Sequence, residues 1–267
     1  MVVQNFSAST IRSYKSGILR VYGYFNLPLR ELSDQQLVGF VCHLKEEKGL
    51  SRASMRISVA SIKYFYKHVL GRGPLVEKIP YPKKEVHIQA ILSGKEIWQL
   101  FNQTTNLKHR FLLKLIYSAG LRRSEIIHLQ PEDLDWLNMQ VTVRQGKGKK
   151  DRYSILARSL RSDYELYMQQ YAPTHYLFYG RHKSHPITPS LIRWAMDQAV
   201  KRAGITKNVH IHSLRHSFAS HLLSLNTDIV TVQRLLGHDD IRTTMAYLHL
   251  NHHPENKPRS PLDMIYK

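Results

Sequence analysis

Cysteine, acidic side chains and long apolar runs are all scarce in this chain of 267 residues. Cys42 is the only cysteine, so no intramolecular disulfide can form, and this composition fits a reducing cytoplasm. Because Cys42 falls in the apolar run 38–44, we expect a buried core thiol. No stretch approaches the ~18 consecutive apolar residues of a membrane span, and the start lacks the pattern of a signal peptide. We therefore expect a cytoplasmic protein with no membrane partner.

The shortage of acidic residues leaves a large positive charge. Lys and Arg number 39 against 20 Asp and Glu, which gives a formal net charge of +19. A charge of this size indicates a polyanionic partner such as nucleic acid. It is spread along the chain, with +8 on residues 1–90 and +11 on residues 91–267. The length suits two domains of roughly 100–200 residues each. A ribosomal-type basic protein would share this composition but does not account for the motifs described below.

Residues 1–73 are predicted to form an N-terminal helical domain. Apolar residues recur at helical spacing in three stretches, and Ser33 with Gln36 forms a capping-box pattern before the second one. Ser7 or Ser9 can begin the first helix, and Ser51 the third. The polar faces are basic and could contact phosphates as well as water. The candidates for DNA contact in this domain are Arg52, Arg56 and Lys63.

A basic linker is expected over residues 74–91. It contains Pro74, Pro80 and Pro82, which stiffen the chain and disfavour a helix. Lys83 and Lys84 add positive charge, so both are further candidates for DNA contact.

Residues 92–267 are predicted to form a second, mainly helical domain with a small antiparallel sheet. A capping box at Ser93 and Glu96 begins a helix over 94–103, and a second helix over 108–119 stops at Gly120. Alternation predicts strands over 139–145 and 152–155, joined by a glycine- and lysine-rich turn at 146–150. Further helices are expected over 157–171, 189–203, 213–225, 228–236 and 240–248.

Residues suited to phosphodiester chemistry gather near the C-terminal end. Arginine clamps phosphate oxygens with a planar fork of donors, histidine transfers protons near neutral pH, and tyrosine can form a covalent phosphoester. Arg122 and Lys147 add two cations upstream. The C-terminal set is His212, Arg215, His238 and Tyr247.

Three strings in this order resemble the tyrosine recombinase (phage integrase) family. They are GLRRSE at 120–125, HSLRH at 212–216, and LGH at 236–238 followed nine positions later by Tyr247. Each string alone is weak evidence, but the order and spacing together are specific. The motifs cover roughly residues 93–250, and the N-terminal part agrees by architecture alone.

The resemblance implies a role for each of these residues. Arg122, rather than the adjacent Arg123, and Arg215 would grip the phosphate. Lys147, in the Gly-Lys-Gly core of the turn, would protonate the leaving 5′ oxygen, with Lys149 as the alternative and with Lys149 and Lys150 as candidates for DNA contact. His212 would transfer a proton to or from the tyrosine, and His238 would donate a hydrogen bond to the phosphate. Tyr247 would be the nucleophile, and Glu125 would support the site.

The same resemblance implies a SAM-like fold for the N-terminal domain and a site-specific DNA recombinase that needs no cofactor. It would bind double-stranded DNA with specific recombination sites, and four copies of the chain would assemble as a homotetramer on two duplexes. A type IB topoisomerase and a non-catalytic DNA-binding protein of the same fold are the alternatives. The ending RSPLDMIYK is similar to integron integrases, but the helical insertion of that subgroup is missing, which favours an Xer-like or transposon-borne enzyme.

A metal site is the other interpretation of the histidine-rich stretch. His212 and His216 are four residues apart, which would place both on one helical face. No HExxH glutamate accompanies them, and the only cysteine is far away in the sequence. We therefore expect no metal, and we expect His216 and His221 to be structural or surface residues.

Overall fold

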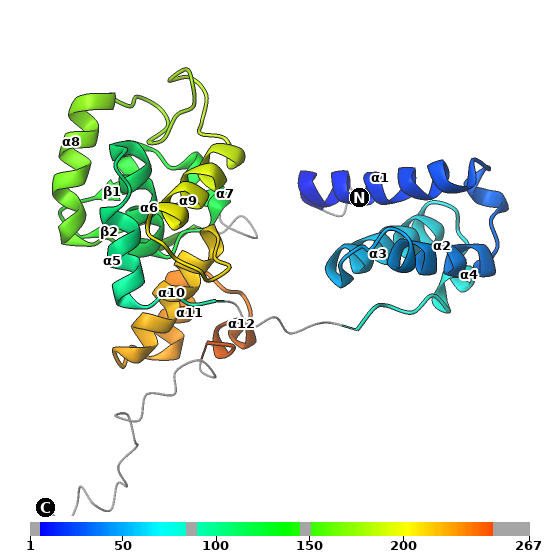
Figure 1. Cartoon of the computed structure of the whole chain (residues 1–267). Helices are drawn as coiled ribbons and strands as arrows, with labels where there is room; N and C mark the ends of the chain where they lie inside the picture. The colour runs from blue at the N-terminus through cyan, green and yellow to red at the C-terminus, as the bar shows by residue number, and fades with distance from the viewer. Residues whose placement is uncertain (1–5, 84–89, 145–150, 248–267) are drawn as a thin grey trace, which may run out of the picture. The chain divides into compact units, whose positions relative to one another are not determined.

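A computed structural model describes residues 6–83, 90–144 and 151–247 of the chain. The chain divides into two compact units, Met1–Ile88 and Gln89–Lys267 (Figure 1). Each unit has its own hydrophobic core. None of the helices in the described ranges combines the length and apolar character that a membrane span needs.

The first unit is helical, and serine side chains begin its three long helices. Ser7, Ser33 and Ser51 each accept a hydrogen bond from a backbone N–H in the first helical turn. Ser33 and Gln36 form the predicted capping box. The elements are α1 (Ala8–Phe25), a 3₁₀ turn (Leu29–Glu31), α2 (Asp34–Glu46), α3 (Arg52–His68) and α4 (Gly73–Glu77).

Close packing of α1 against α3 shapes this unit. A Cβ on Gly17 would lie 2.1 Å from the Ser61 hydroxyl oxygen, so glycine lets the two helices approach. The fully buried rings of Phe40 and Tyr66 lie in the core with Leu37 and Ile62.

Two predictions for the first unit are wrong. Residues 73–77 form α4 instead of the start of a linker, because Pro74 occupies the first turn, where a missing N–H costs nothing. Val76 and Ile79 are buried in the core of this unit. Cys42 is exposed, because it lies off the apolar face of α2.

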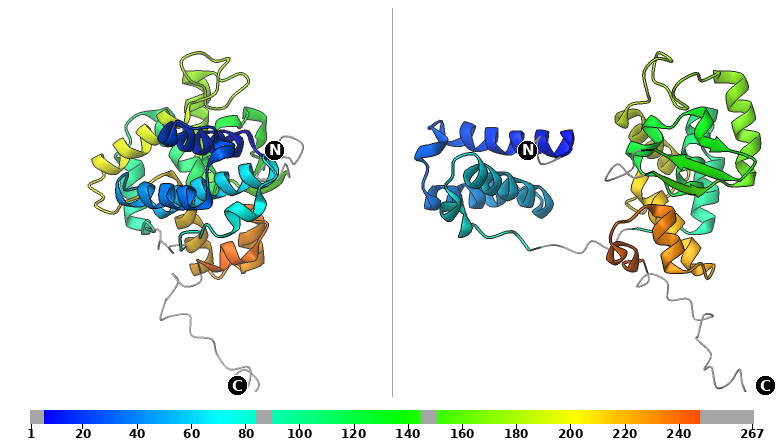
Figure 2. Two further views of the ribbon diagram at one scale, coloured as in Figure 1. Left: turned by 90° about the vertical axis from the view of Figure 1, so that its right-hand side faces the viewer. Right: turned by 180° about the vertical axis from the view of Figure 1, so that it is seen from behind.

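The second unit packs helices against a three-stranded antiparallel sheet in the order β1–β2–β3 (Figures 1 and 2). Val141 pairs with Ser154 in the β2–β3 ladder. The strands are β1 (Leu134–Asp135), β2 (Gln140–Val143) and β3 (Arg152–Ile155). The helices are α5 (Gly94–Asn102), α6 (Leu107–Ala119), α7 (Arg123–His128), α8 (Arg161–Tyr171), α9 (Pro189–Arg202), α10 (Ile211–Ser224), α11 (Ile229–Leu236) and α12 (Ile241–Met245).

The packing of α6, α10, α11 and β3 positions the candidate residues. α10 packs against α6 and α11, and β3 packs against both α6 and α11. The ends of α6 and α11, at Gly120 and Gly237, both have left-handed backbone conformations. The expected fold class, mainly helical with a small antiparallel sheet, is confirmed. The sequence analysis missed α7 and β1, which are short.

Candidate active site

Arg122 lies where α6 gives way to α7. α6 ends at Gly120, whose φ of 59° turns the chain so that Arg122 precedes the first turn of α7. The backbone N–H of Arg122 and its Nη1 each donate to the Glu125 carboxylate at 2.7 Å. Its Nη2 donates to the carbonyl oxygen of Gly237 at 2.6 Å. Arg123 is exposed, so the geometry favours Arg122 over its neighbour.

Arg215 joins the ends of two helices. This residue of α10 is 3% exposed and donates to the carbonyl oxygens of Gly120 and Leu236, at the last turns of α6 and α11. Such carbonyls lack helical partners and carry the negative end of the helix dipole, so they attract a guanidinium. Its Nη1 also lies 3.9 Å from the Glu125 carboxylate. Arg215 and Arg122 therefore share the Glu125 carboxylate as an anionic neighbour.

Glu125 has a third arginine partner in Arg152 of β3. Arg152 Nη2 donates to Glu125 at 3.0 Å, and Arg152 Nε donates to the carbonyl oxygen of Leu235 at 3.0 Å. The Arg152 side chain is 10% exposed, and its Nη1 is buried without a hydrogen-bond partner among the described residues. A buried donor of this kind suits a ligand with acceptor oxygens.

Electrostatically, the cluster has an excess of positive charge. Three guanidinium groups surround the single carboxylate of Glu125. Burial raises the pKa of Glu125, but Arg152 and the hydrogen bonds from Arg122 outweigh burial and hold it below its ordinary value. Glu125 therefore stays ionised at neutral pH and compensates one of the three positive charges. The remaining charge suits an anion such as a phosphodiester.

His238 directly follows the glycine that ends α11. Its carbonyl oxygen accepts a hydrogen bond from Gln233 at 2.9 Å, and its Nδ1 pairs with the Thr244 hydroxyl at 2.9 Å. Burial and then the nearby Arg215 and Arg122 lower the pKa of His238 to about 3. The imidazole is therefore neutral at neutral pH and oriented by Thr244.

Tyr247 lies between two histidines. It is 5% exposed, and its ring stacks with that of His238 at a centroid distance of 6.4 Å. Its hydroxyl pairs with His216 Nδ1 at 2.6 Å. Burial raises the pKa of Tyr247, while Arg215 and Arg122 partly oppose that rise. The phenol is thus protonated at neutral pH and lies in the field of the arginine cluster.

Comparisons with known proteins agree with this geometry. Residues 90–253 match the phage integrase family, and residues 1–73 match the N-terminal SAM-like domain of phage integrases. The chain belongs to the phage integrase family. Among its relatives, the putative integrase/recombinase y4qK of Sinorhizobium fredii (strain NBRC 101917 / NGR234) is 35% identical, over 99% of this chain and 86% of that protein. Tyrosine recombinase XerC of Staphylococcus aureus (strain JH9) is 29% identical, over 98% of this chain and 96% of that protein.

Solved structures extend the likeness. The crystal structure of XerA recombinase is 27% identical with a TM-score of 0.59, covering 97% of this chain and 96% of that one. A lambda integrase tetramer bound to a Holliday junction shares the fold at 15% identity, with a TM-score of 0.75 and coverage of 96% and 75%. This phage integrase family member is a tyrosine-type site-specific DNA recombinase.

Five of the predicted residues of the recombinase come together in this cluster: Arg122, Glu125, Arg215, His238 and Tyr247. His212 is exposed at the start of α10; partial desolvation, followed by nearby His210 and Arg123, lowers its pKa. Its proposed proton transfer with the tyrosine stays a prediction. Lys84, Lys147, Lys149 and Lys150 lie outside the described residues.

The candidates for DNA contact in the first unit differ in their surroundings. Arg52 and Lys83 are exposed. Arg56 donates to the carbonyl oxygen of Pro82 at 2.6 Å and lies over the Tyr81 ring, as Lys63 does. Arg56 and Lys63 therefore help to hold the segment after α4.

Two residues of the site were missed by the sequence analysis. Arg152 was predicted only as the first residue of the strand 152–155, with no role in the site, yet it is mostly buried beside Glu125. The alternation of β3 pointed the wrong way, because its apolar residues Tyr153 and Ile155 are exposed whereas Ser154, on the same face as Arg152, is buried. His216 was interpreted as structural or surface, yet it contacts the Tyr247 hydroxyl, and its position beside Arg215 was the available signal.

Within the described ranges, no group of three or more His, Cys, Asp or Glu side chains has an arrangement that could hold a metal ion.

Proposed function

We propose that this recombinase cuts one DNA strand at a time through a covalent 3′-phosphotyrosyl bond. Tyr247 attacks the phosphorus and releases a 5′ hydroxyl. The observation that carries this proposal is the buried position of Tyr247 in the field of Arg215 and Arg122, which partly oppose the rise that burial causes in the pKa of its phenol. A phosphodiester resists attack because its negative charge repels nucleophiles, and a pre-organised set of cations removes that obstacle.

The other side chains of the cluster divide the remaining tasks. Arg122 and Arg215 bind the non-bridging oxygens, and Glu125 keeps Arg122 in place. A Thr244 hydroxyl that donates to His238 Nδ1 leaves the proton of this neutral imidazole on Nε2, where it can donate to the phosphate. Lys147 is the proposed acid for the leaving 5′ oxygen, and His212 is a candidate for proton transfer with the tyrosine.

The covalent bond makes strand exchange possible without ATP. Because the phosphotyrosyl bond stores the energy of the cleaved phosphodiester, the freed 5′ hydroxyl of a partner strand can attack it and rejoin DNA. Two rounds on a pair of specific sites pass through a Holliday junction. The proposed assembly is a homotetramer on two duplexes, and the likeness to the fold of the lambda integrase tetramer bound to such a junction supports it. The first unit is proposed as a core DNA-binding domain, which its match to the SAM-like domain supports.

The test uses a duplex with a nick close to the cleavage site, so that the covalent complex is trapped. The wild-type protein is expected to form an SDS-stable DNA adduct, whereas Tyr247→Phe should bind the same DNA without forming one, because only the phenol oxygen is lost. An adduct of normal yield with Tyr247→Phe would refute this nucleophile. Relaxation of plasmids without exchange between two sites would instead indicate a topoisomerase.

A further inference from the structure

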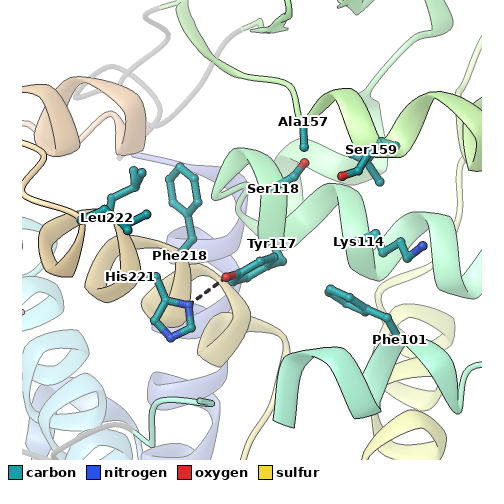
Figure 3. A pocket seen from close by; sticks show the side chains of 11 residues that line it. Phe101, Lys114, Tyr117, Ser118, Ala157, Ser159, Phe218, His221 and Leu222 are labelled. Carbon is teal, nitrogen blue, oxygen red and sulfur yellow. Dashed lines mark hydrogen bonds between the residues drawn. The ribbon is translucent and has the colours of Figure 1, made fainter. Parts of the chain in front are cut away.

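Helix α10 presents two histidines, His216 and His221, to two different tyrosines. His216 Nδ1 pairs with the hydroxyl of Tyr247 at 2.6 Å, and His221 Nδ1 pairs with that of Tyr117 at 2.8 Å. Figure 3 shows the second pair, which lines a cavity of about 320 Å³ with Phe101 and Phe218. Both pairs have the same kind of histidine–tyrosine hydrogen bond, but Tyr117 has no part in the proposed chemistry.

We propose that His216 is a further catalytic residue whose Nδ1 takes the proton of the Tyr247 hydroxyl during strand cleavage. This inference rests on the proposed function, because it assigns the proton acceptor of the same nucleophile. Arg215 and His216 are consecutive residues of α10. One rigid helix therefore holds both the phosphate ligand and the group that contacts the phenol oxygen.

The protonation states of the pair suit this transfer. Burial, followed by nearby His212, Arg215 and His210, lowers the pKa of His216 to about 4. At neutral pH its imidazole is uncharged, so Nδ1 can accept a hydrogen bond while Nε2 carries the proton. Burial raises the pKa of Tyr247. The phenol is therefore protonated at rest and needs a base within hydrogen-bonding distance.

The other histidines near Tyr247 are less well placed to take this proton. His238 lies against the face of the tyrosine ring, with the two rings nearly parallel at 14°, and its Nδ1 pairs with Thr244. His212 is exposed. The hydrogen bond that the structure gives for the Tyr247 hydroxyl, within the described residues, goes to His216.

The step balances in atoms and electrons. The bond from the Tyr247 oxygen to phosphorus forms, the bond from phosphorus to the 5′ oxygen breaks, and the phenol proton moves to His216 Nδ1. The departing oxygen receives a different proton from the general acid. An imidazolium beside Arg215 and His212 is unfavourable in the free enzyme, and a bound phosphate offsets that cost with its negative charge. In the return step, the imidazolium protonates the tyrosine oxygen as it leaves phosphorus.

Three variants separate proton transfer from positioning. His216→Ala removes the contact, and His216→Asn keeps a hydrogen-bonding amide near the Nδ1 position that cannot take a proton at neutral pH. We expect both to slow adduct formation by about 10²–10⁴-fold, the usual range for general acid–base catalysis, with DNA affinity within a few-fold of wild type. His221→Ala is the matched control, and its cleavage rate should stay within a few-fold of wild type. Circular dichroism and thermal melting report whether each variant folds.

A more acidic phenol gives a readout that a structural role would not produce. A fluorinated tyrosine at position 247, introduced by amber suppression, has a more acidic phenol. Because this phenol loses its proton more readily, cleavage depends less on a base. We expect this change to raise the cleavage rate of His216→Ala at least tenfold and to leave the cleavage rate of Arg215→Ala unchanged. Equal effects in both backgrounds would overturn the proposal. Wild-type cleavage rates in both His216 variants would overturn it as well.

Failure of this inference and failure of the proposed function give different results. If the wild-type protein forms no adduct through Tyr247, the proposed function itself fails. If the wild type forms the adduct and His216→Asn matches its rate while His216→Ala does not, His216 positions the phenol and another group takes the proton.

Discussion

Arg152 Nη2 donates to the carboxylate of Glu125 at 3.0 Å, which ties strand β3 to the first turn of α7. Arg152 also bonds the carbonyl oxygen of Leu235, near the end of α11. Residues from β3, α7 and α11 thus meet at one guanidinium, beneath the segment that carries His238. Loss of Arg152 would affect both the support of Arg122 and the placement of His238.

We expect Arg152→Met to lower the free energy of unfolding by about 2 kcal/mol. This is less than the ~3–5 kcal/mol for breaking a lone buried pair, because Arg122 still compensates Glu125. Cleavage should fall by at least tenfold, measured as adduct yield on a nicked duplex. Arg193→Met is the matched control, since it removes an exposed pair with Asp197 and should cost under ~0.5 kcal/mol. Similar losses in both variants would argue against a supporting role for Arg152.

The sequence was most informative where structure depends on neighbours in the chain. Serine caps such as Ser33 and Ser93 were visible because the capping contact spans three residues. Strand 152–155 was predicted with its observed bounds because a short hairpin alternates in polarity. Pro74 misled the prediction of a linker, because proline both interrupts helices and favours their first turn.

The site was harder to predict wherever a contact joins distant residues. Arg152 and Glu125 are 27 positions apart, and His216 and Tyr247 are 31 apart. No local pattern fixes which histidine of α10 faces the phenol, since the packing of α10 against α6 and α11 decides it. Family motifs identify candidate catalytic residues, but they do not show which neighbouring side chains support those residues.

Glu125 should make stability depend on pH. Although burial opposes the shift, Arg152 and Arg122 hold its pKa below the ordinary 4.5, so the folded state binds this proton less readily than the unfolded state. The contribution is therefore present above about pH 4.5 and is lost as pH falls through the lower, folded pKa. Glu125→Gln should be less stable than wild type at pH 7 in urea unfolding, and the difference should shrink on acidification. A difference independent of pH would mean that packing, not charge, explains the role of Glu125.

Adjacent arginines offer a sharp test of the phosphate ligand. Arg122 contacts Glu125 and Gly237, whereas Arg123 is exposed. Removing one pre-organised donor from the transition state costs roughly 10²–10³ in rate. We expect this loss in single-turnover cleavage by Arg122→Ala, with a modest loss of affinity in fluorescence anisotropy. Arg123→Ala should cleave within a few-fold of wild type, and the opposite ranking would reassign the phosphate ligand.

The general acid can be tested by chemistry at the leaving group. Lys147→Ala should fail on normal DNA, because the 5′ oxygen leaves poorly without a proton. A substrate with sulfur at the 5′ bridging position should restore cleavage, since a thiolate leaves without protonation. Lys149→Ala is the matched control and should behave as wild type on both substrates. Rescue of Lys149→Ala instead of Lys147→Ala would move the role to that residue.

Gly237 brings the end of α11 against the arginine cluster. Its φ is 62°, and a Cβ there would lie 2.5 Å from Arg152 Cδ and 2.9 Å from Arg152 Nε. Gly204 has a similar φ of 66° with open space around it, so Gly204→Ala measures the backbone strain alone, about 1 kcal/mol. Gly237→Ala should lose that amount in urea unfolding plus the cost of displacing Arg152, and its adduct yield should fall while that of Gly204→Ala holds. Equal losses of stability with full cleavage in both variants would show that Gly237 serves only the turn.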